Sequence, residues 1–353
     1  MNRQATLSVI VIGLFPLLAS AETIIVDPNG SFDFTTIQAA IDYSRDGDTV
    51  IVRPSTYNEE ILFNGRRITL MSLDPDDESI VDSTIINGFE PVTFNFGENI
   101  SSVITGFTII GSNKSIKCLS CSPSIIGNKI LGSSVGISNC GGIISNNIIS
   151  HSTTGIICSN IETIISNNVI NDHSSYGIYF GSLAPVLIVR NNIISNNDTG
   201  LRSLNGASNN SYNCFWNNNT HFENGATAGT GDFLRDPLFV GGSDYHLKSA
   251  TGRYDSMTKI WVLDDVNSPC IDAGDPCDPI GVEPNPNGGR INIGAYGATV
   301  QASKSPSGIA EPVCVNPPSM DTNGDCKIDF IDFTEFAKQW LTCGLDPQSA
   351  CWE

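Results

Sequence analysis

The chain has 353 residues, with 18 Lys and Arg against 37 Asp and Glu, which gives a formal charge of −19 at neutral pH. Such an acidic chain is a poor partner for nucleic acid, because binding to phosphates requires concentrated Lys and Arg. Hydrophobic residues make up 40% of the chain and charged residues only 16%. This composition argues against global disorder and favours a β-rich secreted protein over a helical cytosolic enzyme.

The N-terminal segment has the features of an export signal. Arg3 supplies positive charge, and the apolar run Leu7–Leu18 has the length of a signal-peptide hydrophobic region. The segment Ala19–Ala21 then gives the small-x-small pattern that signal peptidase accepts, so we expect the mature chain to begin at Glu22. A membrane anchor is the weaker alternative, because the run is shorter than the roughly 18 residues that a span needs. We therefore expect a secreted protein, extracellular or at the cell surface.

A short helix is expected near the start of the mature chain. Ile37, Ala40 and Ile41 recur at the i, i+3, i+4 spacing of a buried helix face. Thr35 or Thr36 can cap its N-terminus. A helix at this position can cover the first rung of a stacked β-structure and hide its unpaired edge.

The middle of the chain repeats at short and nearly regular intervals. One series is an Asn that recurs at Asn128, Asn146, Asn167 and Asn191. A second series is a Gly before an aliphatic residue, which recurs at Gly136, Gly155, Gly177 and Gly200. Periods of roughly 20 residues indicate stacked units that each bury little surface alone.

The repeats predict an all-β parallel β-helix. Each unit holds short runs of Ile and Val broken by Gly, Ser and Asn, without a leucine-rich consensus and without a helical segment between the strands. We expect one coil per repeat, strands stacked about 4.8 Å apart, and inward columns of Ile and Val. The recurring Asn side chains can stack in a turn and satisfy backbone groups, which is a structural role and not a catalytic one.

Residues 22–300 resemble the right-handed parallel β-helix proteins of the pectin-lyase-like superfamily. The early part of the resemblance lies in residues 24–27, 33–41, 46–52 and 54–59, with Ser55 where family members usually carry Gly. Residues 236–240, 244–247, 268–275 and 293–297 resemble the closing segment of many secreted bacterial β-helix proteins. The resemblance implies a right-handed coil with an N-terminal capping helix, and association with polysaccharides.

The C-terminal tail carries the sharpest chemical motif, at residues 321–332. Oxygen-bearing side chains fall at loop positions 1, 3, 5, 9 and 12, and position 7 offers its backbone carbonyl; the six residues are Asp321, Asn323, Asp325, Lys327, Asp329 and Asp332. Ca²⁺ takes about six to eight oxygen ligands, so this spacing predicts an EF-hand-like calcium loop. An amphipathic helix is expected to follow, with Phe333, Phe336, Ala337, Trp340 and Leu341 on one face. The alternative is an acidic turn that caps this helix.

This tail resembles one dockerin repeat, the module that docks secreted bacterial polysaccharide-degrading enzymes to cohesin partners. It departs from that family at Cys326, where Gly is usual, and in having a single repeat where dockerins carry two. Phe330 and Ile331 occupy positions that dockerins often use for partner recognition. Disulfides among the surrounding cysteines can replace the missing repeat's support; these are Cys314, Cys326, Cys343 and Cys351. Calcium binding is better supported than binding to a cohesin-like or cell-surface partner.

The remaining cysteines fit an exported chain. There are eleven in all, so at least one stays free unless it pairs between chains. Cys118 and Cys121 form a Cys-x-x-Cys pair, but nothing completes a zinc site, and packed or disulfide-bonded cysteines are the better interpretation. Cys270 and Cys277 bracket a Pro/Asp/Gly loop, which a disulfide between them would staple.

The superfamily resemblance implies lyase or hydrolase chemistry, but no complete catalytic set is recognisable. Lyases need a base beside a Ca²⁺-neutralised uronate, and glycoside hydrolases need two carboxylates at a defined separation. The carboxylate segments of esterases and polygalacturonases are missing from the middle repeats. The acidic pairs Asp76-Asp77 and Asp264-Asp265 lie outside them.

One weak constellation of polar residues is present. Counting five residues past each repeated Asn gives Ser133, His151, Asp172 and Asn196, with His173 and Asp198 nearby. If the register holds, His151 and Asp172 stack on adjacent rungs, either as a solvated turn column or as a catalytic pair. Arg190 and Arg202 on neighbouring strands can face a uronate. Three aromatic residues can stack on sugars or pack in the core, namely Tyr212, Phe215 and Trp216.

The sequence therefore divides into a signal peptide (1–21), a β-helix (22–300), a linker rich in Ser and Pro (301–313) and a calcium-binding module (314–353). Two functions remain open. The first is a secreted polysaccharide lyase or O-glycosyl hydrolase with a calcium-dependent docking module, which the module favours by analogy. The second is a non-catalytic glycan-binding or structural surface protein, which the missing catalytic set favours. Both imply a polysaccharide partner, no nucleic acid and no membrane span.

Overall fold

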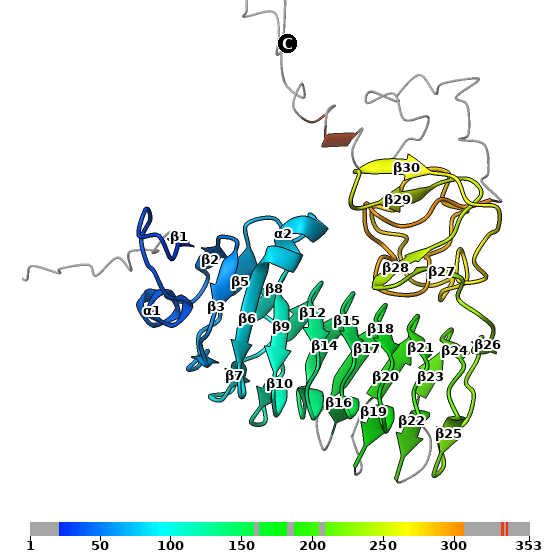
Figure 1. The fold of residues 1–353 in the computed structure, drawn as a ribbon, viewed down its shortest axis with the longest axis horizontal. Helices are drawn as coiled ribbons and strands as arrows, with labels where there is room; N and C mark the ends of the chain where they lie inside the picture. The colour runs from blue at the N-terminus through cyan, green and yellow to red at the C-terminus, as the bar shows by residue number, and fades with distance from the viewer. Residues whose placement is uncertain are drawn as a thin grey trace, which may run out of the picture.

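A computed structural model describes residues 21–306, apart from 159–161, 182–186 and 205–208, together with Phe333, Thr334 and Ala337. Within these residues, short parallel strands stack into a long solenoid, and a closing segment at 236–306 returns over one side of it (Figure 1). The expected export signal up to residue 20 and the expected calcium loop lie outside the described residues.

Three parallel sheets form the faces of the solenoid, and we name them A, B and C in the order in which each coil visits them. Sheet A stacks β1 (Thr23–Val26), β2 (Thr49–Val52), β5 (Thr69–Ser72), β8 (Val103–Thr105), β11 (Ser124–Ile126), β14 (Gly142–Ser145), β17 (Thr163–Ser166), β20 (Leu187–Arg190) and β23 (Asn209–Ser211). Sheet B stacks β3 (Ser55–Tyr57), β6 (Thr84–Gly88), β9 (Thr108–Gly111), β12 (Lys129–Leu131), β15 (Ile148–Ser150), β18 (Val169–Asn171), β21 (Ile193–Ser195), β24 (Cys214–Trp216) and β26 (Phe233–Leu234). Sheet C stacks β4 (Ile61–Leu62), β7 (Val92–Phe94), β10 (Lys114–Cys118), β13 (Val135–Ser138), β16 (Thr154–Cys158), β19 (Tyr176–Phe180), β22 (Thr199–Ser203) and β25 (Thr220–Glu223).

The interior is filled by columns of aliphatic side chains, as the repeats predict. In sheet B the register places Ile109, Ile130, Ile149, Ile170 and Ile194 in one column, all fully buried. Sheets A and C contribute equivalent columns around Ile144 and Ile156. Each such side chain contributes about 1.5–3 kcal/mol through removal of its apolar surface from water. The parallel β-helix prediction is confirmed.

Helix α1 (Ile37–Tyr43) covers the N-terminal end of the stack, and its buried face is the one that the spacing predicts (Figure 1). Thr36 is the N-cap residue, but its side chain makes no capping hydrogen bond. Instead the two carboxylate oxygens of Glu59 accept from the backbone N–H groups of Ile37 and Gln38, each over 3.0 Å. Glu59 therefore satisfies orphan donors of the first turn and places negative charge at the positive end of the helix dipole.

Helix α2 (Glu78–Ser83) lies between β5 and β6, with Asp77 as its N-cap through a hydrogen bond from Ser79 N. It reaches toward the closing segment (Figure 1). Among the described residues, no helix has the length and apolar character needed to cross a bilayer.

The closing segment packs on the outer side of sheet B. It contains two antiparallel hairpins, β27 (Phe239–Gly241) with β28 (Asp244–Leu247), and β29 (Arg253–Asp255) with β30 (Ile260–Val262). A second apolar cluster joins its side chains to outward residues of sheet B, namely Ile148, Val169, Ile193 and Cys214. These strands are apolar on both faces because both faces are buried. Gln301, Ser303 and Ser305, at the start of the expected linker, are buried as part of this segment.

The cysteines are partly as expected. Cys118 forms a disulfide with Cys140, 22 residues away, while Cys121 is a buried free thiol. The predicted staple between Cys270 and Cys277 is wrong, because both thiols are free in the structure. Cys270 is buried in the apolar cluster that also contains Cys214, whereas Cys277 is exposed, so the two side chains occupy different environments.

Candidate functional site

The turn between sheets A and B explains the repeated Asn residues. Its first residue has a positive φ, at Gly127, Asn146, Asn167, Asn191 and Tyr212, a conformation that Gly and Asn tolerate better than most residues. Its second residue is a buried Asn, at Asn128, Asn147, Asn168, Asn192 and Asn213. The strand pairing of Lys129 with Ile148 aligns Asn128 with Asn147, so the predicted alignment of Asn128 with Asn146 is wrong by one position.

The buried asparagines form a continuous ladder of amides. Each donates its Nδ2 hydrogens to the Oδ1 of the Asn in the next coil, over 3.0–3.2 Å from Asn128 to Asn213, and the ladder ends on Asp232 Oδ1. Each Oδ1 also accepts the backbone N–H of the preceding Asn in the ladder. The predicted stacking of turn amides is therefore present, but of the four asparagines named from the sequence only Asn128 takes part in it.

The first residues of three of these turns bind the closing segment. Sequence analysis missed this role. Asn146 Nδ2 donates to the carbonyls of Ala295 and Gly297, over 3.0 and 2.8 Å. Asn167 Nδ2 donates to Asn292 O over 3.1 Å, and Asn191 accepts from Asp275 N over 2.7 Å. Their partners are 84 to 151 residues away, so no local pattern points to them.

The turn between sheets B and C carries the predicted polar constellation. Its first residue again has a positive φ, and four successive exposed side chains form what we call the outer column, namely His151, Asp172, Asn196 and Asn217. His151 Nδ1 lies 2.7 Å from Asp172 Oδ2, with exposed fractions of 56% and 58%. The prediction that these two residues stack on adjacent rungs is confirmed. Ser133 was wrongly assigned to this column, because it hydrogen-bonds to Ser152 of the next coil.

Behind the outer column, His173 is buried and neutral. Its Nδ1 accepts from Ser152 N over 3.2 Å, so its Nε2 carries the proton and donates to Ile149 O over 3.1 Å. Burial lowers the pKa of His173 to about 4, because the imidazolium would lose its hydration. A Cβ on Gly155 would lie 2.7 Å from His173 Nε2, so the repeated Gly of sheet C makes room for these turn side chains.

A polar groove of about 710 Å³ lies between the outer column and the closing segment, and we call it the column groove. Its floor is a directional chain of hydrogen bonds in which Asn217 donates to Asn196, Asn196 to Asn171, and Asn171 to the hydroxyl of Tyr245. Asp198 lies beside this chain and accepts from Asn219 Nδ2 over 2.9 Å. Tyr245 and Asn171 were not predicted as site residues, since Tyr245 belongs to a motif that indicated architecture only.

The column groove can support proton transfer at His151. Asp172 orients the imidazole through Nδ1, and Nε2 makes no hydrogen bond to any residue that the structure describes. An exposed imidazole held by a carboxylate is a suitable general base or acid. Asp198 supplies a second carboxylate to the groove. This is the arrangement of reactive groups that the geometry offers.

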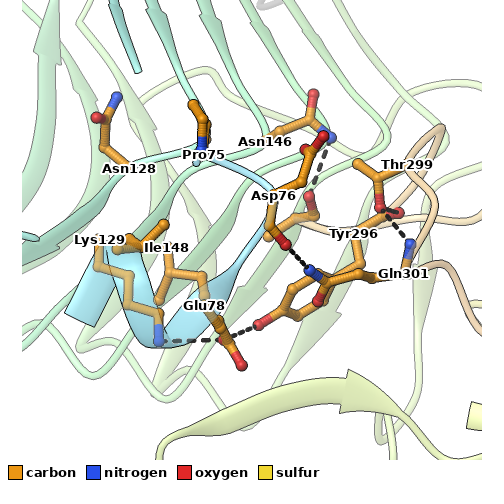
Figure 2. Close-up of a pocket in the computed structure, with 13 residues that line it drawn as sticks. Pro75, Asp76, Glu78, Asn128, Lys129, Asn146, Ile148, Tyr296, Thr299 and Gln301 are labelled. Atoms are coloured by element: carbon orange, nitrogen blue, oxygen red, sulfur yellow. Dashed lines mark hydrogen bonds and ion pairs between the residues drawn. The ribbon is translucent and has the colours of Figure 1, made fainter. Parts of the chain in front are cut away.

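A second, smaller pocket of about 80 Å³ lies between α2, sheet B and the closing segment (Figure 2). Lys129 Nζ lies 3.1 Å from Glu78 Oε1 and 2.6 Å from Asp82 Oδ1. Burial alone would raise the pKa of Glu78, but Lys129 and the hydroxyl of Tyr296 stabilise the carboxylate and lower it. The Lys129 pKa is raised, because Glu78 and Asp82 outweigh the effect of burial.

The side chains around this pocket are engaged with one another. Tyr296 stacks on His246 with ring centroids 3.6 Å apart. His246 contacts Asp244 Oδ1 over 2.7 Å and Gln301 Oε1 over 3.1 Å, and Gln301 Nε2 donates to the backbone carbonyl of Asp76 (Figure 2). The small volume and the mutual pairing indicate a structural junction, so the column groove is the better candidate site.

The two arginines proposed to face a uronate do not converge. Arg190 is in sheet A, where its Nε lies 2.9 Å from Asp278 Oδ2. Arg202 is in sheet C, beside Glu223 and over the Tyr176 ring at 5.0 Å. The pairing of these residues in a uronate site is therefore wrong, because successive sheets of the coil separate them.

The three predicted aromatic residues also separate. Phe215 is fully buried in the core, whereas Trp216 is 38% exposed on the outside of sheet B. Tyr212 lies under the guanidinium of Arg290 at 5.3 Å. They do not form one sugar-stacking surface.

The residues expected to hold calcium, Asp321 to Asp332, lie outside the described residues. In the part of the chain that the structure describes, no group of three or more His, Cys, Asp or Glu side chains is placed to hold a metal ion.

Residues 105–274 match a family described as disaggregatase related. No curated protein matches the chain. Among solved structures, the chain is similar to the pectate lyase Pel9A, with 13% identity, a TM-score of 0.48, and coverage of 78% of this chain and 96% of that one.

Proposed function

We propose that the chain is a secreted, polysaccharide-associated protein of the right-handed parallel β-helix type that binds an extended glycan along the column groove. The observation that carries this proposal is the alignment of His151, Asp172, Asn196 and Asn217 on successive coils along one polar groove. Amide, imidazole and carboxylate groups pair with sugar hydroxyls, and a regular column of them suits a polymer with a regular repeat.

Catalysis by this groove is the further part of the proposal. His151, oriented by Asp172, would act as the base that removes a proton in a lyase, or as the acid or base of a hydrolase with Asp198 as second carboxylate. The matching family is described as disaggregatase related. Cleavage of a polysaccharide that holds an aggregate together would fit that description. The alternative is a non-catalytic glycan-binding protein, which the mutual pairing of the groove amides favours.

The test is product release and binding on a panel of polyuronates and neutral glycans. New reducing ends or unsaturated products from the wild-type protein, lost in His151→Ala and Asp172→Asn but kept in Asn224→Ala on another turn, would establish the enzyme. Binding without turnover would favour the alternative. A chain that neither binds nor cleaves any glycan would overturn the proposed function.

We also propose that residues 321–332 bind Ca²⁺ and that the tail docks the protein to a cohesin-like or cell-surface partner. The spacing of Asp321, Asn323, Asp325, Asp329 and Asp332, with the carbonyl of Lys327, supports calcium binding. Titration of the full chain with calcium should show saturable binding that Asp321→Ala and Asp325→Ala weaken. An unchanged affinity in both variants would contradict the assignment.

A further inference from the structure

We infer that the column groove selects glycans without acidic groups, and that it prefers amine-bearing chains to neutral chains and neutral chains to polyuronates. This inference rests on the proposed function, since it names the substrate class of the same groove. It opposes the uronate specificity that the superfamily resemblance alone would suggest. Of the two reactions named for His151 it favours the hydrolase, because β-elimination by a lyase needs a uronate.

The first argument is the charge of the groove lining. Asp172 and Asp198 are both exposed in it. The only described lining groups that can become cationic are two imidazoles, and that of exposed His151 is already paired with Asp172 at 2.7 Å. Buried His173 has its pKa lowered by burial and stays neutral. No Lys or Arg belongs to the described lining of the groove, so a uronate would meet carboxylates without a counter-charge.

The second argument is the position of the neighbouring cations. Arg190 is held by Asp278 on sheet A, 2.9 Å away. Lys129 is held by Glu78 and Asp82 at the junction with α2. Arg202 lies on sheet C, over the Tyr176 ring. Each is engaged on another surface, and moving one into the groove would leave a carboxylate or an aromatic ring without its partner.

The third argument concerns a cation bridge to a uronate. Ca²⁺ in proteins takes about six to eight oxygens. The groove offers only two carboxylates among its described residues, one of which is bound to His151 and the other to Asn219. Within the same residues, no set of three or more potential ligands comes together. The described groove therefore lacks a pre-formed site for a cation bridge.

The fourth argument is the balance of donors and acceptors. The Nδ2 groups of Asn217, Asn196 and Asn171 each use one of their two hydrogens along the chain that ends at Tyr245, so one N–H of each remains. The oxygens left facing the groove are Asn217 Oδ1 and the second oxygens of Asp172 and Asp198, which accept no hydrogen bond from another described residue. These three oxygens can accept about six hydrogen bonds, against three remaining amide N–H groups and the Tyr245 hydroxyl, so acceptors are in excess. Hydroxyl, amide N–H and ammonium groups of a glycan supply the missing donors, while a carboxylate does not.

The experiment measures binding of the full chain to three oligosaccharide series of equal length. Chitosan oligomers carry amines, their N-acetylated forms keep the same backbone without charge, and oligogalacturonates carry carboxylates. We expect affinity to fall in that order, and the amine preference to shrink as salt is raised, since screening weakens exposed charges. Asp198→Asn, which keeps the shape and the bond from Asn219, should reduce affinity for chitosan about three- to tenfold more than it changes affinity for the N-acetylated series.

The outcomes are distinguishable. Tightest binding to oligogalacturonate would overturn the charge inference while leaving the proposed glycan groove intact. An amine preference that Asp198→Asn does not reduce would also overturn it, because the charge would then act elsewhere. No binding to any series would overturn the proposed function together with this inference. Asn224→Ala serves as the control, since Asn224 lies outside the groove lining.

Discussion

Tyr296 donates its hydroxyl hydrogen to Glu78 over 2.5 Å, although 218 residues separate them in the sequence. Glu78 belongs to α2, near the beginning of the solenoid, and Tyr296 to the end of the closing segment (Figure 2). Their contact, with Lys129 on the other side of Glu78, holds the returning chain to the early coils. The junction is therefore an ionic and hydrogen-bonded seam and does not depend on apolar packing alone.

Removal of the Tyr296 hydroxyl should weaken this junction. Tyr296→Phe keeps the ring and its stacking on His246 but leaves Glu78 with one donor fewer. We expect a loss of about 1–3 kcal/mol in the free energy of unfolding, since the lost bond is to a charged group. Urea unfolding of the variant measures the loss. Tyr43→Phe is the matched control, because Tyr43 is 57% exposed, and a similar loss there would assign the effect to something other than the junction.

Substitution of an asparagine at the centre of the amide ladder should destabilise the protein strongly. Asn192 Nδ2 donates to Ile165 O and Arg190 O, over 2.8 and 2.9 Å, and its Oδ1 accepts from Asn168 N. Asn192→Ala leaves these buried backbone groups unsatisfied, so we expect a loss of about 2–5 kcal/mol. Asn217→Ala removes an exposed amide of the outer column and should cost less than about 1 kcal/mol. Equal losses in chemical denaturation would refute a special role for the buried ladder.

His173 should make stability depend on pH on the acid side. Its pKa is lowered by burial to about 4 in the folded chain, below the ordinary value of 6.5. Its contribution is therefore fully present above pH 6.5 and is lost as the pH falls toward 4, because the unfolded chain binds the proton first. The loss amounts to about 3 kcal/mol at 1.36 kcal/mol per pKa unit.

His173→Asn is the matched variant for this effect, because the next two coils carry Asn197 and Asn218 at the same turn position. Unfolding free energies of both proteins between pH 4 and pH 7 should differ by an amount that shrinks as the pH falls, with the wild type losing more stability. Parallel pH profiles for the two proteins would show that His173 does not titrate in this way.

Glu283 should make stability fall as the pH rises, which is the direction opposite to that of His173. Burial raises its pKa to about 7 from 4.5, although Asn292 N and Ala298 N donate to its Oε1 over 2.8 Å each. The raised value means that stability is fully present below pH 4.5 and is lost as the pH rises toward 7. Glu283→Gln keeps the acceptor and removes the charge. We expect it to gain about 3 kcal/mol relative to the wild type at pH 8 and little at pH 4, as measured by urea unfolding; a gain that is equal at both pH values would exclude titration as its cause.

The sequence predicted the fold well where its pattern is local and repeated. Ile columns and turn asparagines recur once per coil, so the periodicity gave the strands and the stacking of His151 on Asp172. The predicted alignment of Asn128 with Asn146 was wrong by one residue because Gly127 occupies the positive-φ position that the next three coils give to Asn. Gly and Asn both tolerate this backbone conformation, so aligning identical residues there was misleading.

The remaining features depend on contacts between distant residues. Glu59 caps α1 from 22 residues away, where local reasoning expected Thr35 or Thr36 to do so. The Cys270 staple failed because closeness in sequence does not determine which side chains are buried together. Tyr245 reaches the groove only because the closing segment lies over sheet B. None of these contacts leaves a periodic signal.

The path of the closing segment has a consequence for how the molecule unfolds. A stack of coils held only by nearest neighbours can fray from either end, one coil at a time. Here one returning segment is fastened near Glu78 at one end and at Asn146, Asn167 and Asn191 farther along. Loosening a single coil between these points does not release the closing segment. We therefore expect the coils under the segment to melt together in one transition, with amide hydrogen exchange slowest beneath it and fastest at β25 and β26.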